Sequence, residues 1–459
     1  MDRLPCILTI AGSDSGGGAG IQADIKAITM LGGYAASVIT ALTAQNTKAV
    51  TSIHAPSAKF VAKQLVTVLD DIEVDAAKTG MLFSAAIIKE LAPVLAKKTF
   101  PLVVDPVCVA TSGTKLLKDD ALDALIEHIF PLADLLTPNI PEAQLFTGIE
   151  IKGRDDVFKA AEKLLAMGPK AVLIKGGHSD SFAVTDWFVT PGAQPMPFMQ
   201  QRVDTKNTHG TGCTLSAAIA VGLGQGLNMG AAILKAQDYL NLALRAGYRL
   251  GEGGGPPNHL APWFKEQARN DVLAQVDEIG RRLIAASGFK VMLPLGRANI
   301  AVALPYADNV SEVAGFSGGF IVSSRDHVSV VGYPEFGASL RSASVLLAVN
   351  RLQGQFGACM ALGSTPVIKL ALEKAGAEVI WMDRDGMPES MRDENGSFEE
   401  WGAFEAYKSC TNPEAVHAVG DPGAIGRESV IYILAEDTEA LMERMHEIAD
   451  VLTADVDSL

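Results

Sequence analysis

The chain has 459 residues, of which 48% are hydrophobic and 20% are charged, and its formal net charge is −15 at pH 7. A chain of this length favours two domains with separate cores, and the composition excludes a fibrous or intrinsically disordered protein. The negative charge excludes a general attraction to nucleic acids or anionic membranes, because the field of the whole protein repels phosphate groups.

Cysteine usage and hydropathy predict a cytoplasmic protein. The apolar run at the start of the chain is too short for a secretory signal, and no stretch has the roughly 18 apolar residues that span a bilayer. We therefore expect small-molecule substrates, no membrane or nucleic-acid partner, and a homo-oligomer whose size the sequence does not define. The five cysteines are scattered, without a CxxC pair or zinc-type spacing, as expected in a reducing compartment: Cys6, Cys108, Cys213, Cys359 and Cys410.

The first half of the chain alternates between two periodicities. Ile21, Ile25, Ile28 and Leu31 recur at helical spacing, and so do apolar residues in 60–72. This rhythm predicts an α/β fold, namely a mainly parallel sheet flanked by helices. Short β-rich runs, several of them apolar on both faces as in buried parallel strands, cover 4–10, 37–44, 102–105 and 171–175.

A glycine- and proline-rich segment separates two parts of the chain. GEGGGPP, at 251–257, ends a helical pattern that runs over 229–250. An amphipathic helix with Val272, Val276 and Ile279 then opens a second, smaller α/β region. We place the boundary at residue 268, which gives domains of 1–268 and 269–459.

Two glycine loops carry the first chemical signals. AGSDSGGGAGIQAD, at 11–24, follows a predicted strand and opens a helix, where glycines permit sharp turns or close approach to a ligand. Taken alone, a tight turn without a ligand explains this loop equally well, and it is neither a Walker loop nor the dinucleotide fingerprint.

The second loop, NTHGTGC at 207–213, immediately precedes an apolar helix. The amide hydrogens of Gly210, Thr211 and Gly212 and the positive end of the helix dipole would converge there on an anion. An isolated cysteine is more often a small buried hydrophobe, but at a helix N-terminus we expect the pKa of Cys213 to fall, which makes it a candidate base.

Together, the two loops resemble the signature of the hydroxymethylpyrimidine/phosphomethylpyrimidine kinases, a branch of the ribokinase-like superfamily. Most members of that superfamily have an aspartate where this chain has Cys213, and a cysteine marks the pyrimidine-kinase branch. The resemblance extends over roughly 4–265, one domain, and includes VVDPV, TPNIPEA and VLIKGGH in the expected order.

Several residues of these motifs follow predicted strands, where open α/β sheets bind ligands. Asp105 ends the strand of VVDPV, Lys175 ends the strand of VLIKGGH, and Asn139 and Glu142 lie in TPNIPEA. Any one of them alone is better explained as a surface or helix-capping residue, but their coincidence with an anion loop favours a site.

The resemblance implies transfer of the ATP γ-phosphate, with Mg²⁺, to an aminopyrimidine alcohol and then to its monophosphate. We assign the amides of Gly210 and Gly212, with Lys175, to the transferring charge and Cys213 to acceptor activation. We assign the binding of ATP, phosphates and metal to Asp105, Asn139, Glu142 and Thr211, and expect Asp105 and Glu142 to bind the metal. Gln45 offers the aminopyrimidine both a donor and an acceptor, and the same pocket is predicted to contain Gly12, Asp24, Met81 and Val107.

The second region is predicted to be another α/β domain. Strand-like runs at 299–305, 319–324, 378–383 and 428–434 alternate with helical segments at 338–352, 365–375, 399–408 and 438–452. The motifs PEFGAS, MDRDGMPE, EEWG and DPGAIGRES, in this order after a pyrimidine kinase, resemble the archaeal-type thiamine-phosphate synthase domain over roughly 275–455. That domain couples the pyrimidine diphosphate to thiazole phosphate and releases pyrophosphate.

The chain departs from that domain at two points. ACMALGST replaces a segment expected to contain asparagine and arginine, and Arg427-Glu428-Ser429 replaces Lys-Glu-Pro. Arg384, His417 and Arg427 are the candidates for binding diphosphate, although a partly exposed loop histidine explains His417 equally well. Two alternatives stay open: a non-catalytic C-terminal module that binds thiamine phosphates, and a pyridoxal kinase in the first domain.

Overall fold

The computed structural model describes residues 3–108, 117, 120–176, 183–324, 327–389 and 397–456. Internal contacts divide the chain into two compact units, 1–263 and 264–459. This division and the predicted boundary at 268 both fall within helix α9 (Ala261–Ala285). Among the described residues, no helix combines the length and the apolar character needed to cross a membrane.

The first unit is built on a nine-stranded sheet with the order β3-β2-β1-β4-β5-β6-β7-β8-β9. Strands β3 (Val50–His54), β8 (Ala183–Val189) and β9 (Met196–Gln201) add antiparallel edges. The central strands pair in parallel, as predicted, and four of them match the runs predicted from the sequence. They are β1 (Cys6–Asp14), β2 (Tyr34–Gln45), β4 (Ala76–Thr79), β5 (Leu102–Val104), β6 (Leu135–Leu136) and β7 (Val172–Ile174).

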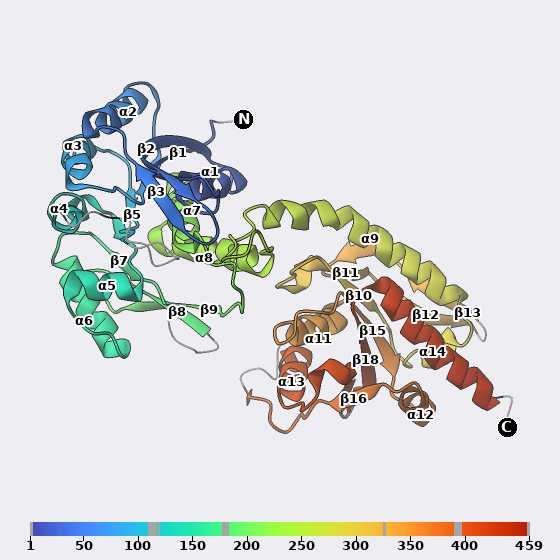
Figure 1. Ribbon diagram of the computed structural model, residues 1–459. Helices are drawn as coiled ribbons and strands as arrows, with labels where there is room; N and C mark the ends of the chain where they lie inside the picture. Colours follow the sequence, from blue (N-terminus) through green and yellow to red (C-terminus); the bar gives the residue numbers. More distant parts are fainter. Residues whose placement is uncertain are drawn as a thin grey trace. The chain divides into compact units, whose positions relative to one another are not determined.

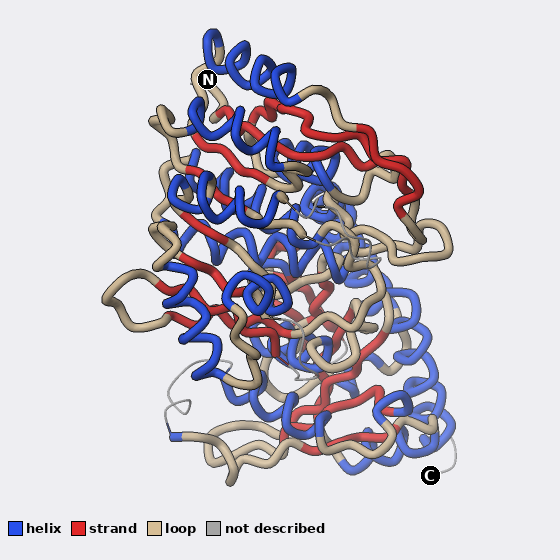
Figure 2. The backbone as a smooth tube through the Cα atoms, turned by 60° about the vertical axis from the view of Figure 1, so that its left-hand side comes forward, coloured by secondary structure: helices blue, strands red, loops and turns tan. Residues whose placement is uncertain are grey.

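Helices cover both faces of this sheet (Figures 1 and 2). In β1, Leu8 and Ile10 point to one core and Ile7 to the other, so a strand apolar on both faces is buried on both. Helices α1 (Gly20–Met30), α7 (Thr211–Gly224) and α8 (Met229–Arg245) pack on the Ile7 face. The opposite face packs against α2 (Ala58–Asp71), α3 (Ala85–Leu95), α4 (Ala121–His128), α5 (Ile140–Thr147) and α6 (Arg154–Leu165), with the short helix η1 (Phe130–Leu132).

The parallel strands bring four polar residues to one edge of the sheet, and three of them, Gln45, Asp105 and Lys175, were predicted as site residues. Asp14 and Gln45 are the last residues of β1 and β2, while Asp105 and Lys175 directly follow β5 and β7. Because parallel strands end at the same edge, residues from distant parts of the sequence lie together there.

The second unit contains a seven-stranded sheet with the order β14-β11-β10-β15-β18-β17-β16. Its neighbouring strands are antiparallel except for the pair β16 and β17. The strands are β10 (Ile300–Ala303), β11 (Val313–Phe316), β14 (Pro334–Phe336), β15 (Ala358–Gly363), β16 (Glu378–Trp381), β17 (Val416–Asp421) and β18 (Val430–Ala435), with a separate hairpin of β12 (Gly319–Ser324) and β13 (His327–Val331).

The sheet of this unit has a hydrophobic core on each face, and different helices cover the two cores. Cys359 and Ala361 of β15 face one core and Met360 faces the other, so this strand is also buried on both sides. The helices α11 (Leu340–Asn350) and α13 (Ser397–Lys408) pack on the Cys359 face. The other face packs against α9, α10 (Phe289–Met292), α12 (Pro366–Lys374) and α14 (Thr438–Val456), and short turns form η2 (Val310–Glu312) and η4 (Pro413–Ala415).

Candidate active site

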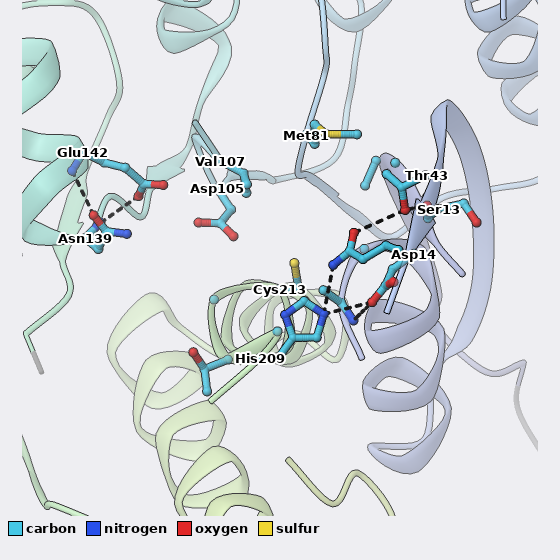
Figure 3. A pocket seen from close by; sticks show the side chains of 18 of the residues that line it. Ser13, Asp14, Thr43, Met81, Asp105, Val107, Asn139, Glu142, His209 and Cys213 are labelled. Carbon is cyan, nitrogen blue, oxygen red and sulfur yellow. Dashed lines mark hydrogen bonds and ion pairs between the residues drawn. The ribbon is translucent and has the colours of Figure 1, made fainter. Parts of the chain in front are cut away.

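A cavity opens at the carboxyl edge of the first sheet. Its walls come from the ends of the parallel strands and from the start of α7 (Figure 3). Most of the residues predicted for the kinase site line it: Gly12, Gln45, Met81, Asp105, Val107, Asn139, Glu142, Lys175, Gly210, Thr211, Gly212 and Cys213.

Helix α7 requires glycine at its N-cap. Gly210 has φ +86°, and a Cβ there would lie 1.9 Å from the carbonyl oxygen of Gly18, so the two glycine loops touch. Within the described residues, no acceptor takes the amide hydrogens of Gly212 and Cys213. Both amides therefore remain available for an anion at the positive end of α7.

An ion pair lies against this loop. Lys175 Nζ is 2.8 Å from Asp105 Oδ1, and a Cβ on Gly212 would lie 3.3 Å from both Lys175 Nζ and Asp105 Oδ2. Burial lowers the pKa of Lys175, but the carboxylates of Asp105 and Glu142 outweigh burial and hold that pKa above its ordinary value. The ammonium group therefore stays charged next to the anion loop.

Glu142 caps a helix as well as lining the cavity. Its Oε2 accepts the backbone N–H of Asn139 at 2.9 Å, and its own N–H donates to Asn139 Oδ1 at 2.8 Å, which forms a capping box at the start of α5. Burial raises the pKa of Glu142 to about 6, against the attraction of Lys175. The capping role and the cavity role therefore coexist in one side chain.

The residues present fit Mg²⁺ held mainly by phosphate and water. No group of three or more acidic, histidine or cysteine side chains in the described part of the chain forms a metal cage. Asp105 and Glu142 supply carboxylate oxygens at the cavity, and Mg²⁺ commonly binds one or two carboxylates together with nucleotide phosphates.

The predicted fall in the pKa of Cys213 is wrong for the ligand-free protein. Burial raises the pKa of the thiol to about 11, and the nearby carboxylates of Asp24 and Asp105 add to this effect. The cation of Lys78 and the N–H of Gly20 oppose it but do not overcome it. Cys213 is therefore a neutral thiol at pH 7 when the cavity contains no ligand.

The structure places Asp24, a predicted pocket residue, beneath the site rather than in it. Its side chain is 0% exposed and bonds to Lys78 Nζ at 3.0 and 3.2 Å and to Thr9 Oγ1 at 2.6 Å. The attraction of Asp24 keeps the pKa of Lys78 above its ordinary value despite burial. Asp24 therefore neutralises a buried cation and has no oxygen directed at the cavity.

Sequence reasoning missed the polar contacts around His209. His209 Nε2 lies 3.0 Å from Asp14 Oδ2 (Figure 3) and 3.2 Å from Gln45 Nε2, and all three residues line the cavity. Because one ring nitrogen either donates or accepts, it serves Asp14 or Gln45 at a given moment but not both. The sequence offered one signal for this contact, because Asp14 and His209 each lie in one of the two glycine loops.

In the second unit, Arg384 and Arg427 converge on one buried carboxylate. Arg384 Nη2 lies 2.6 Å from Asp421 Oδ1, and Arg427 Nη2 lies 3.2 Å from Asp421 Oδ2. Arg427 also pairs with Glu399, which is 0% exposed and 3.2 Å from Arg341 Nε. Sequence reasoning missed Arg341, Glu399 and Asp421, because they join this cluster only through the fold.

His417 does not belong to that cluster. It lies near the start of β17, whereas Asp421 ends the strand. Its ring packs edge-on against Phe356 with centroids 6.3 Å apart, and burial lowers its pKa. A diphosphate at the arginine cluster would therefore lie at the other end of the strand, so His417 is not placed to bind it.

Comparison with known proteins finds a matching family model for each unit. The family model for phosphomethylpyrimidine kinase matches residues 14–258. The chain belongs to the phosphomethylpyrimidine kinase family. A second family model, thiamine-phosphate synthase ThiN, matches residues 275–447, which confirms the resemblance of each region.

Known proteins match the first unit. A hydroxymethylpyrimidine/phosphomethylpyrimidine kinase of Rhizobium meliloti is 48% identical over 262 residues, 56% of this chain and 98% of that protein. The thiamine biosynthesis bifunctional protein ThiED of Geobacter sulfurreducens is 49% identical over 255 residues, 55% of this chain. The chain spans 52% of the length of the Geobacter protein.

Solved structures of pyridoxal kinases share the fold of the first unit. An ADP complex from Bacillus subtilis is 34% identical with a TM-score of 0.53 and covers 57% of this chain and 99% of that chain. A Staphylococcus aureus enzyme in complex with AMP-PCP and pyridoxal is 32% identical with a TM-score of 0.52 and covers 56% and 94%. These relatives bind adenine nucleotides.

Proposed function

We propose that the first unit uses ATP to phosphorylate 4-amino-5-hydroxymethyl-2-methylpyrimidine and then its monophosphate. The observation that carries this proposal is one cavity that contains both an anion loop and a hydrogen-bonding amide. The open amides of Gly212 and Cys213 lie beside Lys175 and Asp105, and Gln45 lines the same cavity. Phosphoryl transfer depends mainly on this kind of positioning and charge neutralisation.

Each group has a distinct role in this proposal. The amides at the start of α7 and the ammonium of Lys175 stabilise the transferring phosphoryl group. Asp105 and Glu142 would hold Mg²⁺ through water, and the ion would neutralise nucleotide phosphates. Gln45 orients the aminopyrimidine between the apolar side chains of Met81 and Val107.

Cys213 is proposed to act on the acceptor hydroxyl. Its thiol is neutral in the ligand-free site, so any activation of the hydroxyl requires the bound substrates to lower the pKa of the thiol. Replacement of Cys213 by alanine should largely abolish both phosphorylations while the protein stays folded. Near-normal turnover of that variant would remove Cys213 from the mechanism.

We propose that the second unit couples the pyrimidine diphosphate to thiazole phosphate. The support is the ThiN match together with Arg341, Arg384 and Arg427, whose three positive charges exceed the two negative charges of Glu399 and Asp421. An excess of guanidinium groups suits a diphosphate, because each can bind phosphate oxygens bidentately.

The test is to give the purified chain ATP, Mg²⁺, the hydroxymethylpyrimidine and thiazole phosphate, and to measure thiamine phosphate. We expect thiamine phosphate to form. Accumulation of the pyrimidine diphosphate alone would refute the synthase role and favour a module that only binds thiamine phosphates. One observation favours that alternative: ACMALG, which replaces an expected polar segment, forms the fully buried strand β15.

A pyridoxal kinase is the second candidate for the first unit, because solved pyridoxal kinases share its fold. Substrate competition separates the two activities: pyridoxal should compete poorly with the aminopyrimidine if Gln45 selects for an amino group.

Free cysteines throughout the described chain support a cytoplasmic location, and we further propose a homo-oligomer. Size-exclusion chromatography with light scattering tests the oligomer.

A further inference from the structure

The end of the glycine- and proline-rich stretch, with the two residues after it, packs against the kinase site. Residues 255–259 are all buried. The N–H of Asn258 donates to the carbonyl of Ala243 at 2.8 Å, and Tyr239 donates its hydroxyl to the carbonyl of His259 at 3.0 Å. We call residues 255–259 the strap, which lies within the first compact unit.

The strap contacts both glycine loops of the cavity. The carbonyl of Gly255 accepts the N–H of His209 at 3.1 Å. A Cβ on Gly18 would lie 3.3 Å from Pro256 Cβ and 2.5 Å from His209 Cδ2, so the first loop, the second loop and the strap meet at this point. A displaced strap would therefore remove support from His209, which lines the cavity.

One hydrogen-bond chain anchors the strap to the anion loop. Thr214 Oγ1 is 2.9 Å from the carbonyl oxygen of Gly210 and 2.9 Å from His259 Nε2. The Gly210 carbonyl accepts both the hydroxyl proton and, at 2.9 Å, the backbone N–H of Thr214, so in this arrangement His259 Nε2–H is the donor to Thr214 Oγ1. Burial lowers the pKa of His259 to about 4, so the ring is neutral at pH 7 and has a single N–H, which this contact places on Nε2.

We propose that His259 is a positioning residue for phosphoryl transfer, because through Thr214 it locks the strap to the carbonyl of Gly210. A peptide bond is planar, so a fixed Gly210 carbonyl also fixes the N–H of Thr211 and the start of α7. The amides of Gly212 and Cys213 then keep their direction into the cavity. This inference rests on the proposed kinase function, and it makes the connecting segment part of the kinase site.

Two matched pairs of variants of the full chain test the proposal. His259→Ala removes the donor, whereas His259→Gln offers an N–H at a similar reach; Thr214→Val removes the oxygen, whereas Thr214→Ser keeps it. Leu260→Ala is the control, because Leu260 is 47% exposed and directly follows the strap. For each protein we would measure kcat, the KM for the aminopyrimidine, and the affinities for ADP and for AMP-PCP with Mg²⁺.

AMP-PCP carries a γ-phosphate and ADP does not, so their affinity ratio reports the anion loop. We expect His259→Ala and Thr214→Val to lower kcat about tenfold or more and to weaken AMP-PCP relative to ADP, with the pyrimidine KM within about twofold. His259→Gln and Thr214→Ser should recover most of both losses. A purely structural role would lower the folded fraction without changing this ratio.

A folded His259→Ala protein with unchanged kcat and an unchanged AMP-PCP to ADP ratio would overturn the proposal. If His259→Ala does not fold, equal behaviour of Thr214→Val and Thr214→Ser would overturn it instead. Absence of turnover in the unaltered chain would refute the proposed kinase function, and the nucleotide ratio would still decide on the strap.

Discussion

Breaking the buried ion pair of Lys78 and Asp24 should strongly destabilise the first unit. Both side chains are 0% exposed, and Asp24 accepts two contacts from Lys78 and one from Thr9. Removing one partner of a buried pair leaves an uncompensated charge and costs about 3–5 kcal/mol. We therefore expect Lys78→Met and Asp24→Asn each to destabilise the kinase unit by this amount, on the order of 10 °C in Tm.

The double variant Lys78→Met with Asp24→Leu supplies the comparison. Replacing both charges with apolar groups of similar volume is often neutral or stabilising, so it should recover most of the loss from either single change. Calorimetry of the full chain measures these effects, and the kinase transition is the one that ADP shifts to higher temperature. A single variant that costs less than about 1 kcal/mol, or a double variant as unstable as the singles, would refute the reasoning.

Four further predictions concern individual groups. Burial raises the pKa of Glu142 to about 6 in the ligand-free protein. The contribution of this group to stability is therefore fully present below its unfolded pKa and is lost as pH rises through 6. In urea titrations, Glu142→Gln should raise the free energy of unfolding by up to about 2 kcal/mol at pH 7 and leave it unchanged at pH 4. Gly212→Ala should lower kcat on the order of 100-fold with little change in Tm, because a Cβ would meet the Lys175 and Asp105 pair; normal kcat would contradict this. The rate of alkylation of Cys213 by iodoacetamide in the ligand-free chain should reach half its maximum near pH 11. A midpoint near pH 7 would show that burial does not control the pKa of the thiol. Arg427→Met should stop formation of thiamine phosphate while the pyrimidine diphosphate still forms. Loss of both products would show that Arg427 does not act in a synthase site separate from the kinase site.

The sequence predicted the sheet and the edge on which the cavity lies. Apolar runs that are hydrophobic on both faces indicate buried parallel strands, and such strands end at one edge. Asp105 and Lys175 were therefore predicted to lie together although they are 70 positions apart, and their side chains are 2.8 Å apart in the structure. Local pattern and topology were sufficient for this part.

Electrostatic environment was not predictable from local sequence. Cys213 lies in the first turn of a helix, which favours the thiolate, but the depth of burial and the carboxylates of Asp24 and Asp105 come from other elements. Asp24 itself lies next to a glycine loop in the sequence, yet its partner Lys78 lies on β4, 54 positions away. Which side chain faces the cavity and which faces the core depends on packing that the motif does not record.

The second unit shows what a departure from a family pattern can mean physically. ACMALG forms the central strand β15, which is buried on both faces, so its apolar residues satisfy the core and provide no charge to a ligand. Any binding of diphosphate must then come from other elements, and Arg341, Arg384 and Arg427 are the guanidinium groups that meet around Asp421 and Glu399. These carboxylates already engage the arginines, so a diphosphate has to compete with them for the same donors. Removing the negative charge of Asp421 should therefore tighten binding of inorganic pyrophosphate if the cluster is an anion site, and should only loosen the fold if it is structural.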